Sequence, residues 1–403
     1  MKKIHYGWLV CAGCALLLFC TSGLSINAFT VYQPYIMAQN GFTNAQSSAI
    51  ITFRSLSSFL GMLLTGFYYK KLSLRTGMGA AGGLLLAGFV TYAFAESHFA
   101  YCLGSTLVGF GYGFGTMIPI AMVLGRWFAA KRTFALGICS AITGFSTLGI
   151  PSLLTSLVEK YGLRHTFLLE SGCIALLVAA AVLLIRSDPG ELGLQPYGAA
   201  PEEDAAPAAS GPSVLTGKYW LLIVPMLLLL GAMTNVGYSH LSVLLSSQGF
   251  DGQLTALAIT VSGITLTLGK YGYGWLSDRV GTYHSNRIFG AVLTLGMTLC
   301  CVMGSSPAVM LAAMVCYGAG LATTTVGLNA WAGDLSSPDQ YNVNVRRFQL
   351  GYSGGTLLFS SLPGVLADRF GGSYVPAYLF FVFCTLFVLG SVQWLYRAAG
   401  KHL

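Results

Sequence analysis

The sequence has very little charge. Only 8% of its 403 residues are Asp, Glu, Lys or Arg, whereas soluble globular proteins carry about 25% of these residues. A soluble chain with so few charges could not cover its surface with polar groups. Because 55% of the residues are hydrophobic, the composition excludes an ordinary water-soluble domain and indicates a protein whose surface lies in lipid.

The sequence also lacks the motifs of enzymes and metal proteins. It has no Gly-Lys-Ser/Thr phosphate loop, no catalytic triad and no metal-ligand set. Its ten cysteines show no paired Cys/His spacing, and the Cys11-x-x-Cys14 pair lies in a long apolar run. We therefore expect no enzyme activity, no cofactor and no metal, and we interpret the cysteines as small buried apolar residues.

Long apolar runs take the place of the missing charge. Each has about 20 residues or more, the length that a helix needs to cross the hydrocarbon core. The run after Met1-Lys2-Lys3 is too long for a signal peptide, so we expect it to remain as the first helix. Hydropathy predicts twelve transmembrane helices, near residues 8–36, 46–69, 76–95, 100–124, 132–157, 165–186, 218–245, 252–277, 287–304, 308–333, 345–368 and 374–396.

One connection is longer than the others. Residues 187–217 contain five prolines and the acidic run Glu202-Glu203-Asp204. Such a composition cannot build a packed core, so we expect a cytoplasmic linker there. The sequence thus predicts an N-terminal six-helix half over residues 1–186 and a C-terminal six-helix half over residues 218–403.

The loops carry Lys and Arg unequally. If the N-terminus is cytoplasmic, the loops on the opposite side hold only Lys160, Arg164 and Arg369, and all other loop cations are cytoplasmic. Cytoplasmic loops of membrane proteins are enriched in these residues. We therefore expect an integral protein of the cell membrane with both termini in the cytoplasm. This topology explains the net charge of +8, so no nucleic-acid partner is expected.

A short turn recurs along the chain. Residues 274–281 and 364–371 share the pattern G-x-L-x-D-R-x-G, and residues 157–162 and 66–71 are weaker copies. The charged positions 70 and 278 are 208 residues apart, and positions 159 and 368 are 209 apart. Two halves, each of two three-helix units, account for this spacing. Because three is odd, successive units alternate in orientation, which is the inverted-repeat arrangement of secondary transporters.

These features resemble a known family. The 274–281 turn resembles the signature loop of the major facilitator superfamily, although the 66–71 copy has Lys70 where an Asp is usual. The resemblance implies the major facilitator fold: an all-α membrane protein with twelve transmembrane helices in two six-helix halves with inverted three-helix repeats. Within the superfamily the chain is most similar to the monocarboxylate transporter and oxalate–formate antiporter group, through Tyr6-Gly7-Trp8, residues 23–34, the glycine-rich residues 109–115, Arg126-Trp127-Phe128, Lys131-Arg132, Ala135 and Gly137.

Arg54 and Lys270 lie well within predicted spans. A charge near the bilayer centre costs about 2.5–3.5 kcal/mol on insertion scales, so such a residue usually faces the protein interior and often marks a substrate path. In the resembled group a cation matching Lys270, usually Arg, pairs with the substrate carboxylate. The alternative for Lys270 is a side chain that extends to the cytoplasmic face. For Arg54, a side chain that reaches outward or braces neighbouring helices is an equal alternative.

Further polar side chains in the spans are candidates for the site, with helix–helix hydrogen bonds as the alternative for each. His240 also has a purely structural alternative, because it lies near the outer end of its helix. Candidates for substrate binding are Lys270, Asn27, Tyr32, Tyr112, Thr116, Asn235, Tyr238, Asn329, Tyr352 and Ser353. Candidates for coupling or gating are Arg54, His240, Asp278 and Arg279.

The spans lack other charges that the resembled proteins use. Leu266 stands where the proton-coupled group has an Asp, Asn27 matches a Lys of that group, and residues 350–353 lack the second cation of oxalate–formate antiporters. We also identify no Asp or Glu within a helix interior, so a built-in proton carrier is not expected.

A single cation favours a small organic monocarboxylate over a dicarboxylate as substrate. We expect a transporter that functions as a monomer by alternating access, through proton symport, anion exchange or uniport. The alternatives are an exporter of amphipathic or neutral solutes and a sensor that binds a ligand without carrying it.

Overall fold

The computed structural model describes residues 5–129, 132–146, 149–198, 215, 217–304, 306–337 and 340–400, and only the backbone of residues 27, 28, 132–134, 140, 141, 144, 145, 341 and 342. The chain divides into two units: Met1–Phe42 with Ala49–Ala205, and Thr43–Ser48 with Ala206–Leu403. Much of the linker expected over residues 187–217 lies outside the described residues, so the predicted domain boundaries stay a prediction.

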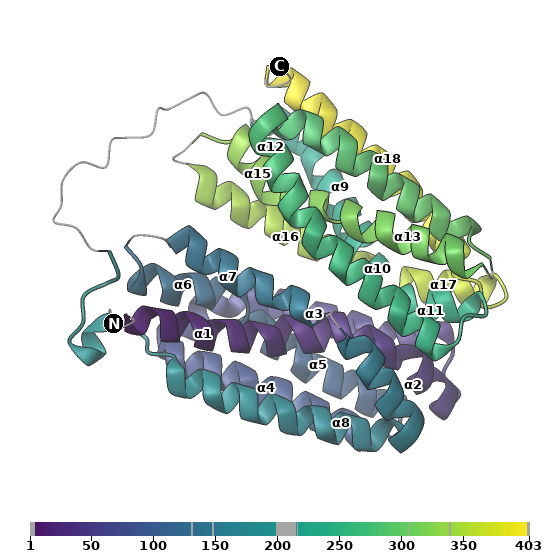
Figure 1. The fold of residues 1–403 in the computed structure, drawn as a ribbon, viewed down its shortest axis with the longest axis horizontal. Helices are drawn as coiled ribbons and strands as arrows, with labels where there is room; N and C mark the ends of the chain where they lie inside the picture. The colour runs from purple at the N-terminus through teal and green to yellow at the C-terminus, as the bar shows by residue number, and fades with distance from the viewer. Residues whose placement is uncertain are drawn as a thin grey trace. The chain divides into compact units, whose positions relative to one another are not determined.

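The first unit is a bundle of long helices (Figure 1). Its helix α4 packs against α5 and α8, and α1 packs against α7 and α8. The elements are α1 (Tyr6–Leu18), the π-helix η1 (Phe19–Ala28), the 3₁₀-helix η2 (Phe29–Val31), α2 (Tyr32–Asn40), α3 (Asn44–Lys71), α4 (Leu74–Ala93), α5 (His98–Gly115), α6 (Met117–Trp127), α7 (Arg132–Phe145), α8 (Ile150–Leu184) and the 3₁₀-helix η3 (Pro189–Leu192).

Trp127 and Phe128 belong to the core of this bundle. Both are buried in a core cluster with residues of α1, α4 and α7. The Trp127 indole N–H donates to the carbonyl oxygen of Arg186 at 2.8 Å, and the backbone N–H of Tyr197 donates to the Trp127 carbonyl at 2.8 Å. The start of the predicted linker is therefore fixed to the first unit by backbone hydrogen bonds.

The second unit is built around the paired helices α12 and α13, with α9 packed against α16 and α18 (Figure 1). Glycines allow α12 and α13 to approach closely, because a Cβ at Gly318 would meet the Ser262 backbone. The elements are the 3₁₀-helix η4 (Gly217–Tyr219), α9 (Trp220–Gly231), the π-helix η5 (Ala232–Val236), α10 (Gly237–Ser239), α11 (Leu241–Ser247), α12 (Gly252–Val302), α13 (Pro307–Gly320), α14 (Ala322–Thr325), α15 (Gly327–Leu335), α16 (Tyr341–Phe359), α17 (Leu362–Arg369) and α18 (Val375–Ala398).

Nine helices within the described ranges are long and apolar enough to cross a membrane. Two of them, α8 and α12, turn back at Gly162 and Gly281 and so hold two straight segments each. The pair α16 and α17 supplies a further segment outside those nine. Together these segments correspond to the twelve predicted spans, with ends that differ by a few residues.

Glycines with positive φ close three of the four repeated turns. Gly162 has φ 77° and ψ 169°, Gly281 has φ 82° and ψ 156°, and Gly371 has φ 66°. Side chains with a Cβ rarely adopt this backbone conformation. The repeat found in the sequence is therefore a chain reversal between helices, and its last residue is Gly because the reversal requires it.

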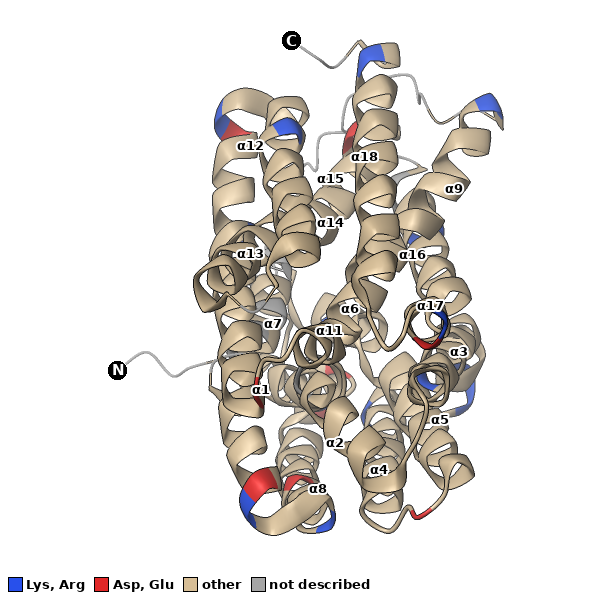
Figure 2. Cartoon of the chain, turned by 90° about the vertical axis from the view of Figure 1, so that its right-hand side faces the viewer, with Lys and Arg blue, Asp and Glu red and all other residues tan. Residues whose placement is uncertain are grey.

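The surface is apolar along the helices and charged at their ends. Figure 2 shows Lys, Arg, Asp and Glu mostly near helix ends, with long uncharged stretches between them. Large apolar side chains are exposed along the same helices, including Leu221 at 85% and Leu176 at 74%. Exposed apolar surface of this extent suits contact with lipid and not with water.

Candidate functional site

Lys270 lies close to the middle of a straight helix segment. The first part of α12 runs from Gly252 to the turn at Gly281, so Lys270 is about 6 Å along the axis from its midpoint at the standard rise per residue. The side chain is half-buried. Among the described residues, the structure gives it no acidic partner. The cation is thus available to a ligand of opposite charge.

The face of α12 that carries Lys270 is neither the face packed against α13 nor the exposed apolar face. Ser262, Thr265 and Gly269 form the seam against α13. Leu268 and Tyr271 are 64% and 67% exposed and lie on the apolar side. Because successive residues turn by about 100° around a helix, Lys270 lies between these two faces.

Small and polar residues share the Lys270 face. Gly263, Thr267 and Gly274 are placed seven, three and four residues from Lys270, as neighbours on the helix surface. The Thr267 hydroxyl donates to the Gly263 carbonyl at 3.0 Å, and no atom would meet a Cβ at Gly274 within 4 Å. This face therefore leaves open space near the cation.

Two predicted polar residues of the second unit join helices. The Thr234 hydroxyl donates to the Tyr352 hydroxyl at 3.1 Å, and the Asn235 amide donates to the Thr356 hydroxyl at 3.3 Å. Both bonds link η5 to α16. Tyr352 and Asn235 therefore make helix–helix hydrogen bonds of the kind named as the alternative, both are half-buried, and their part in substrate binding stays a prediction.

Three other candidates of this unit differ in exposure. Tyr238 is 8% exposed and lies beside Ser262 of α12. Asn329 is exposed and accepts a hydrogen bond from the Gln349 amide at 3.4 Å. Ser353 is half-buried on α16. Tyr238 thus lies against the α12 helix that carries Lys270, whereas Asn329 is an exposed residue in the first turn of α15.

The two halves share a π-helical segment at equivalent positions. Shifting residues 24–28 of η1 by the repeat distance of 208 places them on Ala232–Val236, which is η5. The same shift places Asn27 on Asn235. The Asn27 side chain lies outside the described residues, so its predicted role stays a prediction. Because π-helical turns inside longer helices frequently occur at functional sites, both segments are candidates for the substrate path.

The fourth span is interrupted at Thr116. Its backbone has φ −97° and ψ −148° and separates α5 from α6. Thr116 is 5% exposed and Tyr112, one turn earlier, is half-buried. Interrupted helices are typical of the binding regions of secondary transporters. Thr116 and Tyr112 therefore remain candidates within the first unit.

Arg54 is buried inside the first unit. It is 3% exposed and its guanidinium donates to the Ser25 carbonyl of η1 at 2.9 Å. The guanidinium carbon lies 5.2 Å from the centre of the Phe29 ring, and the hydroxyl groups of Tyr92 and Tyr112 lie nearby. Among the described residues, no carboxylate neutralises it. A buried cation held mainly by a carbonyl and aromatic rings is a candidate anion contact.

The expectation that no acid lies within a helix interior is wrong. Glu170 of α8 is 5% exposed, and the Tyr32 hydroxyl donates to its Oε2 at 2.5 Å. Glu170 lies eight residues after the Gly162 turn, about 12 Å along the helix. The sequence already contained the signal, because a single Glu stands inside the apolar run of residues 165–186.

His240 belongs to a hydrogen-bonded group within the second unit. It is fully buried, its Nε2 lies 2.9 Å from the Ser48 hydroxyl and its Nδ1 lies 3.0 Å from the Val236 carbonyl. Both ring nitrogens thus have neighbours, which supports the structural alternative. Nearby, the Asp368 carboxylate accepts hydrogen bonds from the backbone N–H groups of Asn44 and Ala45, at 3.1 and 2.8 Å.

Asp278 and Arg279 lie at the end of the first segment of α12. Both are exposed, and the Arg279 guanidinium carbon lies 4.1 Å from the centre of the Trp275 ring. They directly precede the Gly281 turn. Their role in gating stays a prediction, since their positions at a helix end are equally suited to fixing the turn.

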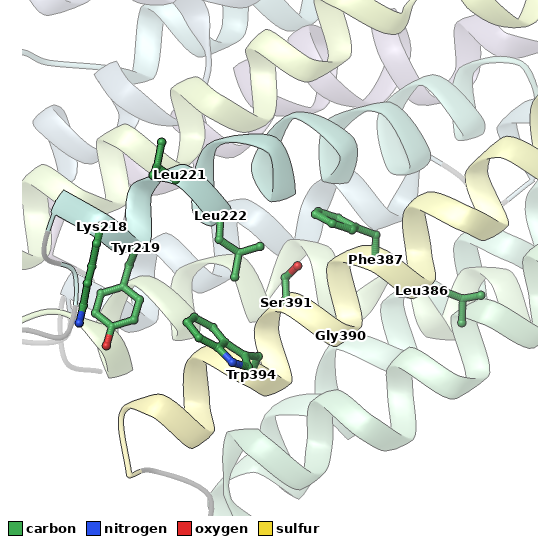
Figure 3. Close-up of a pocket in the computed structure, with 9 residues that line it drawn as sticks. All are labelled: Lys218, Tyr219, Leu221, Leu222, Leu386, Phe387, Gly390, Ser391 and Trp394. Atoms are coloured by element: carbon green, nitrogen blue, oxygen red, sulfur yellow. The ribbon is translucent and has the colours of Figure 1, made fainter.

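A separate pocket of about 590 Å³ lies between α9 and α18 (Figure 3). Lys218 and Tyr219 stand at one end, and the remaining lining is largely apolar, with Leu222, Phe387 and Trp394. Leu221 and Trp394 are 85% and 52% exposed, so the pocket opens onto the apolar outer surface. It does not contain any of the predicted site residues, and we do not assign it to substrate.

The described residues contain no group of three or more His, Cys, Asp and Glu side chains that could hold a metal ion. The described candidate groups are therefore charged and hydroxyl side chains. They are the half-buried Lys270 in the second unit and the buried Arg54, Tyr32 and Glu170 in the first. Such groups can bind anions and protons.

Comparison with known proteins places the chain in a family. The profile of the Major Facilitator Superfamily matches residues 15–285 and 241–402. The chain is 26% identical over 303 residues to monocarboxylate transporter 12 of Rattus norvegicus, covering 68% of this chain and 61% of that protein. It is 28% identical over 334 residues to monocarboxylate transporter 11 of Homo sapiens, covering 78% and 67%. The chain spans 61%, 63% and 57% of the transporter 12 proteins of Rattus norvegicus, Xenopus laevis and Homo sapiens.

Solved structures share the fold. A nucleoside transporter matches with a TM-score of 0.75 at 15% identity, covering 97% of this chain and all of that one. A D-xylose–proton symporter matches with a TM-score of 0.72 at 13% identity, covering 95% and 96%. These relatives are transporters and not enzymes, and the predicted fold class is confirmed. The chain is an integral membrane protein that belongs to the Major Facilitator Superfamily and resembles its monocarboxylate transporter group.

Proposed function

We propose that the chain is a transporter of small organic monocarboxylate anions that works by alternating access. The observation that carries this proposal is Lys270, a half-buried cation near the middle of its helix segment with no acidic partner among the described residues. A charge at this depth is costly unless it is used or compensated. A substrate carboxylate would compensate it during binding.

The surroundings of Lys270 suit a small substrate. Gly274 leaves room on the same face, and Tyr238 lies against the same helix. One cation balances one carboxylate, and an ammonium group binds it as a point charge without the paired geometry of Arg. The names of the related monocarboxylate transporters agree with this substrate class.

We also propose that both termini and the linker face the cytoplasm and that a monomer is sufficient for transport. The unequal distribution of loop Lys and Arg supports the orientation. Epitope tags at the two termini should be inaccessible to antibody in intact cells and accessible after permeabilisation. Labelling of either tag in intact cells would contradict the orientation.

Transport is tested with purified protein in liposomes. We expect uptake of labelled lactate, pyruvate or formate, measured with and without a pH gradient and with unlabelled substrate inside. Lys270→Ala should abolish uptake, whereas Lys218→Ala, which changes an exposed lysine of the same unit, should not.

Each other outcome selects an alternative. Uptake by Lys270→Ala equal to that of the unaltered protein would remove the carboxylate assignment and favour neutral or amphipathic solutes. Binding without uptake or counterflow would indicate a sensor. Stimulation of uptake by a pH gradient would distinguish proton symport from anion exchange and uniport.

A further inference from the structure

The buried pair formed by Tyr32 and Glu170 is not explained by anion binding. Its two residues come from α2 and α8 of the first unit, whereas Lys270 belongs to the second. In its ionised form Glu170 would repel a carboxylate substrate, so it cannot supply the charge that attracts one. The pair therefore requires a role of its own.

The two oxygens of Glu170 have different surroundings. Oε2 accepts a hydrogen bond from the Tyr32 hydroxyl at 2.5 Å. Oε1 is buried and, in the described part of the chain, has no hydrogen-bond partner. A buried polar atom without a partner is unfavourable, and a buried charge without one is more so. A proton on Oε1 would remove the charge and leave the Tyr32 bond intact.

Among the described residues, the groups around Glu170 supply no compensating positive charge. Phe167 and Phe29 pack with Tyr32, with ring centres at 4.3 and 5.8 Å. Among the titratable residues, Cys20 of η1 lies near Glu170 and also near Cys173 of α8. Tyr92 of α4 lies across the aromatic cluster, with its ring 5.4 Å from that of Phe167. Arg54 contacts the ring of Phe29, which packs against Tyr32. Among the described contacts, Arg54 forms no ion pair with Glu170.

We propose that Glu170 is the proton-binding site of this transporter and that Tyr32 positions it. In the proton-loaded state Oε1 carries the proton and Oε2 accepts the Tyr32 hydrogen bond. On release the proton passes from Oε1 to water admitted to the site, and the Tyr32 hydroxyl continues to hold the carboxylate. The proton and the substrate anion then have separate sites in separate units. This inference deepens the proposed function and rests on it for its physiological meaning.

A spectroscopic experiment tests the proton site without any substrate. The infrared difference spectrum of the purified protein between acidic and alkaline pH should contain a carboxylic acid C=O band. We expect Glu170→Gln to lack this band. Glu159→Gln is the control and should keep the band. Glu159 is an exposed acid of α8, before the Gly162 turn, and it also accepts a tyrosine hydrogen bond, from Tyr35 at 2.9 Å.

Tyr32→Phe provides a second test that does not remove the acid. Loss of the hydrogen bond to Oε2 should move the C=O band to higher frequency, whereas Tyr35→Phe should leave it in place. If Glu170→Gln fails to fold, the shift in Tyr32→Phe still decides whether the band belongs to Glu170. A band that is unchanged in Glu170→Gln, or unshifted in Tyr32→Phe, would overturn the proposal.

Transport then separates this inference from the proposed function. We expect Glu170→Gln to retain counterflow of labelled against unlabelled monocarboxylate and to lose accumulation driven by a pH gradient. If the unaltered protein carries no monocarboxylate, the proposed function fails, and the infrared result alone decides on the proton site. If Glu170→Gln still accumulates substrate in response to a pH gradient, the proton site is elsewhere.

Discussion

Tyr32 and Glu170 form a buried hydrogen bond of 2.5 Å between α2 and α8, and the same two helices form an exposed bond of 2.9 Å between Tyr35 and Glu159. The two pairs have the same chemistry and differ in exposure. The comparison isolates burial as the property that distinguishes Glu170. It also supplies a control for experiments on the buried pair, since the two acids lie in α8 on either side of the Gly162 turn.

The contribution of the positive charge of Lys270 can be tested by comparing a variant that keeps the charge with one that removes it. We expect Lys270→Arg to retain uptake and Lys270→Gln to weaken substrate binding about ten- to a hundredfold, because a hydrogen bond to a charged group contributes about 1.5–3 kcal/mol. The KM for uptake in liposomes measures the effect. Equal KM values for the Gln and Arg variants would show that the charge of Lys270 does not contact the substrate.

We expect the buried charge of Arg54 to lower the free energy of unfolding of the protein. It is buried, and in the described part of the chain it donates a hydrogen bond to the Ser25 carbonyl and contacts the Phe29 ring. Replacement of buried charges by apolar side chains of similar size is often neutral or stabilising, by about 1–4 kcal/mol. We therefore expect Arg54→Met to raise the unfolding temperature in detergent and to lower uptake.

The control for Arg54 is Arg75→Met. Arg75 also donates to a backbone carbonyl, that of Val182 at 2.9 Å, but it lies near a helix end and is half-buried. We expect no gain in unfolding temperature there. A lower unfolding temperature for Arg54→Met with unchanged uptake would mean that Arg54 braces helices and takes no part in transport.

The turn at Gly162 should tolerate no other residue without loss of stability. Its φ of 77° and ψ of 169° lie in a region that is essentially restricted to glycine. We expect Gly162→Ala to destabilise the protein by about 1–3 kcal/mol. Gly172→Ala, in the helical part of α8 with no atom near the added Cβ, should be neutral or slightly stabilising. Thermal unfolding in detergent compares the two, and equal unfolding temperatures would contradict the expectation.

The seam between α12 and α13 should be equally sensitive. A Cβ at Gly318 would meet the Ser262 carbonyl oxygen and the Thr265 hydroxyl. We expect Gly318→Ala to destabilise the protein by about 1–3 kcal/mol, the usual cost of overpacking. Gly274→Ala, which meets no atom within 4 Å, is the control for unfolding temperature. The same pair should be assayed for uptake, because Gly274 lies on the Lys270 face.

The sequence predicted the fold because membrane helices are encoded by local composition. Apolar runs and cation-rich loops set the twelve spans, and the repeated turns identified reversals that the structure confirms at Gly162, Gly281 and Gly371. The π-helical segments were not predicted, since one extra residue per turn leaves no mark in hydropathy. The interruption at Thr116 was also missed, because Gly115 and Thr116 are compatible with a continuous helix.

The candidate site was predicted in part. Lys270 and Arg54 were identified because charges are conspicuous in apolar runs. In the structure Lys270 is half-buried and Arg54 is buried. Glu170 was overlooked although it is equally conspicuous. The pairing of Tyr32 with Glu170 could not have been predicted, because the residues are 138 apart in sequence and only the packing of α2 on α8 brings them together.

The equivalence of the two π-helical segments bears on how the halves diverged. Under the shift of 208 or 209 residues, Arg54 corresponds to Ser262, Lys270 to Met62 and Glu170 to Leu379. Each internal charge thus has an uncharged counterpart. The two halves repeat the same arrangement of helices, but each half carries internal charged residues that the other half lacks. A chimaera with two first halves would therefore keep the acid and lose Lys270, so under the proposed function we expect such a symmetric protein to lose its substrate cation.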